Sequence, residues 1–123
     1  MYSLIIKEKF DAAHYLPDYD GDCARLHGHS WKIDAEVQFD KIQPDGMGID
    51  FKELKDKIKP SLPDHEDLNK YFDFVPTAEN IAKFLYIEIA FRLSVYYTLI
   101  NEKISLVSVT VWESDTTGAK YYE

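Results

Sequence analysis

Residues 23–39 decide how this chain folds, and they read CARLHGHSWKIDAEVQF. From residue 29 to residue 39 the side chains alternate in polarity, which predicts a long strand with one buried face. The buried positions are the odd ones, namely Trp31, Ile33, Ala35, Val37 and Phe39. His27 and His29 share this parity, so both imidazoles are expected on the core side, where a polar ring needs a partner.

The two histidines are spaced as metal ligands on a strand. Residues i and i+2 of extended backbone point to the same side, with Cα atoms about 6.5–7 Å apart, a span that one ion can bridge. The alternative is that His27-Gly28-His29 is a polar turn entering the strand. The parity that both histidines share with the buried face favours a metal site.

A second strand is predicted at residues 2–10, where Tyr2, Leu4, Ile6 and Phe10 alternate with more polar residues. The same parity continues through Ala12 to His14. If the two strands are antiparallel neighbours joined by a polar loop at 16–22, the ends that carry the three histidines meet. His14, His27 and His29 are therefore candidate ligands of one ion, and three imidazoles without a fourth protein ligand are typical of an open Zn²⁺ site.

The only cysteine, Cys23, allows two interpretations. It could be the fourth ligand of a closed structural zinc. Its thiol could instead remain free beside the metal and transfer protons, because a thiol of pKa near 8.5 is about 3% thiolate at pH 7 and a nearby cation raises that fraction. The spacing is compatible with both.

The remainder of the chain predicts two helices and two further strands. The first helix runs from residue 51 to about 59, with Asp50 as an acidic cap and Pro60 as its end. The second begins after Thr77 as a plausible cap and runs to about Ile100, with Glu88 and Arg92 spaced to pair. Its apolar residues cover more than one face, including Ile81, Leu85, Phe91, Val95 and Leu99, which predicts burial against the sheet and against a second copy of the chain. Strands are expected at 103–113 and 119–122, joined by a turn.

Two more sites carry candidate chemistry. Glu113 shares the parity of Val107, Val109 and Val111, so its carboxylate is predicted to close the apolar face of that strand, barring a bulge. Its partner could be a lysine or a ligand with two parallel N–H donors. His65, beside Asp64, is either a solvated loop residue or half of a second acid–base pair.

Composition limits the classes of protein that fit. The 123 residues are expected to form one domain, and 46% of them are apolar. A formal net charge of −8 and a pI near 4.9 argue against binding to nucleic acid or an anionic membrane. A single cysteine cannot form an internal disulfide, and the first residues do not resemble a secretory signal, so a cytoplasmic protein is expected. Lys83, Glu88 and Arg92 argue against a membrane span in the long apolar segment.

Several segments together resemble the 6-pyruvoyltetrahydropterin synthase family. They are Phe10-Asp11-Ala12-Ala13-His14, Cys23-x-x-x-His27-Gly28-His29, Asp64-His65 with Leu68-Asn69, Pro76-Thr77-x-Glu79-Asn80, and Trp112-Glu113. They follow the family's order over nearly the whole chain. The three-residue gap after Cys23 is similar to the bacterial and archaeal branch, the 6-carboxy-5,6,7,8-tetrahydropterin synthases of queuosine biosynthesis.

The pattern of elements predicts an α+β fold with the order ββααββ, in which a four-stranded antiparallel sheet carries two helices on one face. The resemblance implies that this single domain, residues 1–123, is a T-fold. It also implies an oligomeric ring, a homohexamer built as a dimer of trimers, with active sites at subunit interfaces.

The resemblance also implies a role for each candidate residue. It assigns His14, His27 and His29 to zinc, Cys23 to the general base, and Asp64 with His65 to a relay pair reaching in from a neighbouring subunit. Glu113 would bind the amino-pyrimidinone edge of a pterin, and Thr77 would help to hold that ring. The implied substrate is 7,8-dihydroneopterin triphosphate, converted to 6-carboxy-5,6,7,8-tetrahydropterin with release of acetaldehyde and triphosphate.

Three alternatives remain open at this level. A pyruvoyl-forming synthase or a side-chain aldolase would use the same fold, metal and substrate class. A zinc-stabilised oligomerisation module without catalysis would use the metal alone.

Overall fold

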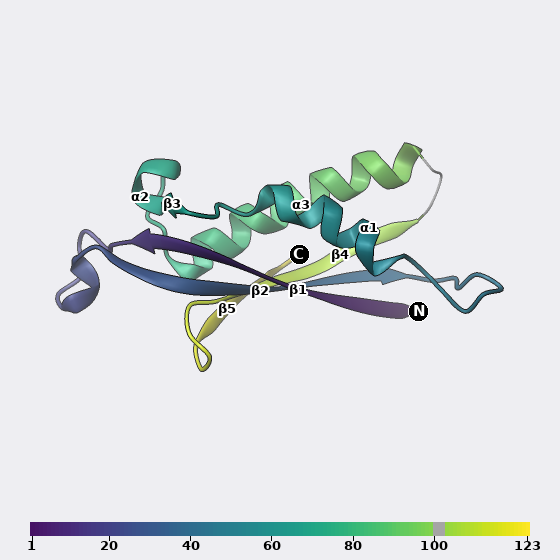
Figure 1. The fold of residues 1–123 in the computed structure, drawn as a ribbon, viewed down its shortest axis with the longest axis horizontal. Helices are drawn as coiled ribbons and strands as arrows, with labels where there is room; N and C mark the ends of the chain where they lie inside the picture. Colours follow the sequence, from purple (N-terminus) through teal and green to yellow (C-terminus); the bar gives the residue numbers. More distant parts are fainter. Residues whose placement is uncertain (100–102) are drawn as a thin grey trace.

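The computed structural model describes residues 1–99 and 103–123, and in that part of the chain helices cover one face of a five-stranded sheet (Figure 1). The strand order is β3-β1-β2-β4-β5. The strands are β1 (Tyr2–His14), β2 (His27–Phe39), β3 (Glu66–Asp67), β4 (Ile104–Trp112) and β5 (Gly118–Tyr122). The helices are α1 (Phe51–Ile58), α2 (Leu68–Tyr71) and α3 (Ala78–Leu99), with short 3-10 turns η1 (Asp22–Ala24) and η2 (Lys59–Ser61).

The predicted fold, a purely antiparallel sheet of four strands with two helices, differs from the structure in two respects: α2 is an additional short helix, and the sheet has a fifth strand. The additional strand β3 lies at the edge and pairs parallel with β1, joining Ala12 to Glu66 and Ala13 to Asp67. Two residues are too few to show an alternating pattern, so the sequence carries no local signal for this strand. The other four strands pair antiparallel as expected.

The antiparallel pairing of β1 with β2 brings the histidines together as predicted. The register runs from Tyr2 opposite Phe39 to His14 opposite His27, with Ala12 opposite His29. Because both strands present their core-facing side chains on the same face, all three histidines lie at one end of that face.

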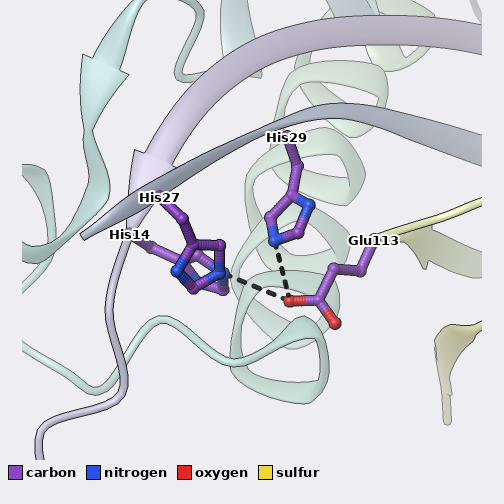
Figure 2. A group of neighbouring side chains, drawn as sticks. All are labelled: His14, His27, His29 and Glu113. Atoms are coloured by element: carbon purple, nitrogen blue, oxygen red, sulfur yellow. Dashed lines mark ion pairs between the residues drawn. The ribbon is translucent and has the colours of Figure 1, made fainter. Parts of the chain in front are cut away.

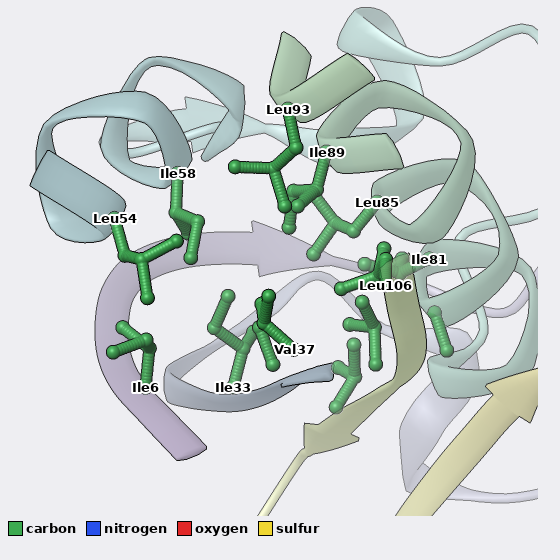
Figure 3. Close-up of a cluster of buried hydrophobic side chains, with 14 of the residues drawn as sticks. Ile6, Ile33, Val37, Leu54, Ile58, Ile81, Leu85, Ile89, Leu93 and Leu106 are labelled. Atoms are coloured by element: carbon green, nitrogen blue, oxygen red, sulfur yellow. The ribbon is translucent and has the colours of Figure 1, made fainter. Parts of the chain in front are cut away.

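The predicted core face of β2 is confirmed. Trp31, Ile33, Ala35 and Val37 are fully buried. Helices α1 and α3 cover this face with residues spaced three and four apart, as the helical period requires. Figure 3 shows this layer, in which the labelled helix residues are Leu54, Ile58, Ile81, Leu85, Ile89 and Leu93.

A bulge changes the parity at the start of β4. Glu36 pairs with Ser108 and Val37 pairs with Leu106, so Val107 has no opposite residue. Leu106 and Ser108 are consequently buried and Val107 is only half-buried, contrary to prediction. Beyond the bulge Val109 and Val111 are buried as expected, and Glu113 follows on the same side.

The predicted helix starts are confirmed. The side chain of Asp50 accepts a hydrogen bond from the backbone N–H of Lys52 at 2.8 Å, and Thr77 Oγ1 accepts one from the N–H of Asn80 at 3.2 Å. Pro60 lies in η2, directly after α1. Ile100, where we expected the second helix to end, lies outside the described residues.

The outer face of α3 is apolar at three positions one turn apart. Ile87, Phe91 and Val95 are each about half exposed or more, while Glu88 and Arg92 form the expected i,i+4 contact at 3.8 Å. None of the helices that the structure describes has the length and hydrophobicity needed to cross a membrane.

The two tryptophans allow a matched test of this core. Trp31 and Trp112 each donate an indole hydrogen bond at 3.2 Å, Trp31 to the carbonyl of Ala12 inside the core and Trp112 to half-buried Asp34. We expect Trp31→Phe to lower the free energy of unfolding by about 2–3 kcal/mol. The substitution removes the indole donor from the buried carbonyl of Ala12 and leaves a small cavity. Trp112→Phe should cost less than about 1 kcal/mol. Urea unfolding of both variants measures the difference, and equal losses would contradict this account of the core.

Candidate metal centre

Four side chains converge at the end of the core face (Figure 2). Among the described residues, potential ligand atoms of His14, His27, His29 and Glu113 all lie within 4.8 Å of one another. His14 is the last residue of β1, His27 and His29 begin β2, and Glu113 follows β4. Three neighbouring strands therefore fix the group, and the register described above sets its geometry.

Backbone carbonyls orient two of the three rings. Nδ1 of His14 lies 2.8 Å from the carbonyl oxygen of Pro76, and Nδ1 of His27 lies 2.7 Å from that of Arg25. A carbonyl oxygen only accepts, so the proton of each neutral ring is on Nδ1 and the lone pair is on Nε2. An outer partner of this kind is usual for a histidine that binds a metal through its other nitrogen.

The inner nitrogens face an acceptor. Nε2 of His14 lies 3.1 Å from a carboxylate oxygen of Glu113, and Nε2 of His29 lies 3.3 Å from the same oxygen. Neither buried Nε2 atom has a hydrogen-bond partner among the described residues. The lone pair on Nε2 of His14 and the carboxylate oxygen of Glu113 repel each other at this distance unless a proton or a metal ion lies between them. The donor set of three imidazoles and one carboxylate fits a divalent transition metal, with zinc among those that imidazole suits.

Burial favours the neutral imidazole of His29. The pKa of His29 is lowered chiefly by burial, and the nearby His14 and His27 lower it further, while Glu113 opposes the shift. Neutral imidazole is the form that binds a metal ion. Trp31 packs its ring edge-on against His14 and His29, with centroid separations of 4.8 and 5.2 Å, and so limits the movement of both.

A cavity of about 330 Å³ adjoins the group. His14, Thr77 and Glu113 contribute to its wall, together with residues of the β4–β5 turn. Sites for small molecules begin at about this volume. The structure thus brings two of the residues implied to bind the substrate, Thr77 and Glu113, into one cavity beside the histidines.

Cys23 lies outside this group. It is a free, half-buried thiol in η1, within the loop that connects β1 to β2. Its sulfur is not among the converging ligand atoms found in the described residues, and the fourth side chain of that group is Glu113.

Asp64 and His65 form a separate cluster with Asp11. A carboxylate oxygen of Asp64 lies 3.1 Å from Nδ1 of His65, and the backbone of Asp11 receives the N–H of His65 at 2.7 Å and donates its own N–H to Asp64 at 2.9 Å. His65 has φ of +59°, the one positive value among the described non-glycine residues. Such backbone outliers persist where surrounding contacts hold them, often at functional sites. His65 and His29 both line a hollow of about 470 Å³, although the structure does not bring His65 into the group of three histidines.

The sequence interpretation missed Asp11. Its carboxylate accepts a hydrogen bond from Ser30 at 2.7 Å, and the two residues are opposite each other on β1 and β2. Their parity places both on the face away from the core, where polar residues are ordinary. The pairing of Asp11 with the loop at 64–65 depends on a contact between distant segments that no local pattern shows.

Asp64 gives a prediction that depends on pH. The pKa of Asp64 is lowered, chiefly because the backbone N–H of Asp11 donates to the carboxylate, and His65 lowers it further. A carboxylate whose pKa is lowered on folding stabilises the folded state. The full stabilisation is present above the unfolded-chain pKa of about 3.9, and it is lost as the pH falls through the folded-state pKa. Asp64→Asn should therefore unfold more easily at pH 7 in the metal-free protein. The difference in unfolding free energy from wild type should begin to shrink as the pH falls below about 4 and keep shrinking through the folded-state pKa. A difference that stays constant in urea titrations over this range would contradict the assignment.

Comparison with known proteins agrees with the fold. An α+β fold with three histidines clustered at one end of its sheet is the arrangement that the pterin-synthase resemblance implies. The family described as 6-pyruvoyl tetrahydropterin synthase matches residues 3–123, and the chain belongs to that family.

Relatives of similar length carry the name of one branch. Proteins named 6-carboxy-5,6,7,8-tetrahydropterin synthase are similar to this chain in Haemophilus influenzae (27% identical, 100% of both chains covered) and in Synechocystis sp. (33%, 97% of this chain and 92% of that one). The one from Bacillus subtilis is 31% identical over 89% of this chain and 77% of its own length. Among solved structures, 6-pyruvoyl tetrahydropterin synthase of Caenorhabditis elegans has a TM-score of 0.81 at 23% identity, covering 99% and 95% of the two chains, which shows a shared fold.

Proposed function

We propose that this chain is a zinc-dependent carbon–carbon lyase. It converts 7,8-dihydroneopterin triphosphate to 6-carboxy-5,6,7,8-tetrahydropterin, releasing acetaldehyde and triphosphate, as a cytoplasmic step of queuosine biosynthesis. The observation that carries the proposal is the convergence of His14, His27 and His29 on one point, with the tautomers of two rings set by backbone carbonyls. The names of the relatives support the choice of reaction.

The three histidines would hold the zinc ion. Bound zinc supplies a Lewis acid that polarises substrate oxygens. The hydrogen bonds that His14 and His27 donate to the carbonyls of Pro76 and Arg25 keep Nε2 of each ring aimed at the centre. Trp31 packs against His14 and His29 and limits the rotation of those two rings.

Glu113 and Thr77 would bind the pterin in the cavity beside the histidines. A carboxylate can accept two parallel N–H bonds from an amino-pyrimidinone edge, and such charge-assisted pairs are strong and directional. In this role Glu113 would turn from the histidines toward the pterin ring when the substrate enters.

Two groups would move protons. Cys23 acts as the general base that removes a proton from the substrate side chain. His65, paired with Asp64, acts from the other side as the second acid–base group. Because the structure places His65 outside the histidine group of its own chain, we propose that the pair serves the site of a neighbouring subunit.

This arrangement requires an oligomer. A homohexamer made of two trimeric rings would place Asp64 and His65 of one subunit beside the metal of another. The exposed Ile87, Phe91 and Val95 on α3 agree with contact between copies.

Product analysis tests the reaction. Purified, zinc-loaded protein incubated with 7,8-dihydroneopterin triphosphate should give 6-carboxy-5,6,7,8-tetrahydropterin and acetaldehyde by mass spectrometry. A pyruvoyl product without acetaldehyde would assign the chain to the pyruvoyl-forming synthases. Cleavage of the pterin side chain without formation of the 6-carboxy product would assign it to the side-chain aldolases. No binding of any pterin, together with unfolding on chelation, would assign it to the zinc-stabilised modules.

A further inference from the structure

Asn69 makes a contact that the proposed reaction leaves unexplained. Its side-chain oxygen accepts the backbone N–H of Tyr15 at 2.9 Å, and its side-chain nitrogen donates to the carbonyl of Tyr15 at 3.0 Å. A carboxamide is the side chain that offers a donor and an acceptor side by side in one plane, so it can pair with a peptide as a neighbouring strand would. The N–H of Asn69 is itself held by Asp67 at 3.1 Å, which fixes the start of α2.

The clamped residue begins the loop that carries Cys23. Tyr15 directly follows β1, and the next residue, Leu16, donates its N–H to the carbonyl of Cys23 at 2.8 Å. At the other end of the loop the carbonyl of Arg25 receives Nδ1–H of His27. Cys23 is therefore held between two anchors, one that depends on the metal-centre histidine and one that depends on Asn69.

We propose that Asn69 is a positioning residue for Cys23: by clamping Tyr15, its carboxamide sets where the loop presents the thiol relative to the histidine group. The chemical role of that thiol rests on the proposed function, but the clamp does not. Asn69 also lies four residues after His65, so one short segment would carry the relay pair and hold the general base. Displacing a reacting group by about 1 Å can lower a rate by about 100-fold, which makes such a clamp matter for catalysis.

Alkylation of the thiol tests the clamp without any enzyme assay. The chain contains one cysteine, so iodoacetamide reports on Cys23 alone. In Asn69→Ala the loop loses both bonds and the half-buried thiol becomes more accessible, so the alkylation rate across pH 6–10 should rise at least about threefold. Asn69→Asp keeps the acceptor for the Tyr15 N–H but loses the donor, and should change the rate in the same direction.

The matched control is at the opposite end of the sheet (Figure 1). Asp45 also holds a loop through its side chain, accepting the N–H of Met47 at 2.9 Å. Asp45→Ala should alkylate at the wild-type rate.

Kinetics separate positioning from a general loss of structure. In Asn69→Ala we expect kcat to fall by about 10- to 100-fold while KM stays within about twofold and zinc content is unchanged, because Glu113, Thr77 and the histidines keep their places. Wild-type alkylation and wild-type kcat in a folded variant would overturn the proposal.

The remaining outcomes are also decisive. If alkylation accelerates as expected but the wild-type protein does not turn over the pterin, the proposed function fails and the clamp stands. If Asn69→Ala does not fold, Asn69→Asp is used with hydrogen exchange at the amide of Leu16, which donates to the carbonyl of Cys23, and unchanged protection there would overturn the proposal.

Discussion

His29→Ala should fold, lose its zinc and lose its activity. His29 is the suitable ligand to remove, because its side chain is a quarter exposed, whereas His14 is buried and its removal would also leave the carbonyl of Pro76 without a partner. Loss of an outer-shell partner alone costs up to about 100-fold in metal affinity, and loss of a direct ligand should exceed that. Turnover should fall by at least about 10³-fold, since a metal ion contributes several kcal/mol to the transition state.

Metal analysis and chelator competition measure this result. Added zinc should raise the melting temperature of the wild type and leave that of His29→Ala nearly unchanged, because a ligand stabilises only the state that binds it. His65→Ala is the control, since it should keep zinc at wild-type affinity and lose turnover. Stoichiometric zinc of unchanged affinity in His29→Ala would refute the metal centre.

Glu113→Gln separates the two roles that the geometry leaves to this carboxylate. If Glu113 is a metal ligand, removing its charge would weaken zinc binding. If Glu113 instead anchors the pterin, the substitution would leave zinc in place and raise KM. We expect the second result.

Cys23→Ala should keep zinc and the fold while losing about 10²- to 10⁴-fold in turnover, the usual contribution of a positioned general base. The reason is its location: the thiol is on η1 and outside the converging ligand atoms, so the histidines remain complete without it. Zinc content, melting temperature and kcat measured on one preparation test the separation of the two functions.

Cys23→Ser distinguishes proton transfer from a structural role. Serine preserves the size of the side chain but ionises far less readily than a thiol, so it would restore a packing contact and would not restore a base. Loss of zinc in both variants would show that the sulfur closes the metal site, and the catalytic proposal would have to be withdrawn.

Elements with a local cause could be predicted from the order of the residues alone. Alternation along 27–39 fixed the buried face of β2, and the same parity carried His14 to that face at the end of β1. The caps at Asp50 and Thr77 and the end of α1 near Pro60 also follow from neighbouring residues. These features depend on side-chain direction and backbone chemistry within a few positions, so the types of neighbouring residues are enough to predict them.

Features that join distant segments became visible only in the folded chain. The pairing of β3 with β1, the bulge at Val107 and the clamp of Asn69 on Tyr15 each depend on where another part of the chain lies in space. The same is true of the carbonyl of Pro76, which sets the tautomer of His14 from 62 residues away. Hydrogen bonds between segments form only once packing has brought them together, so no periodicity in the sequence records them.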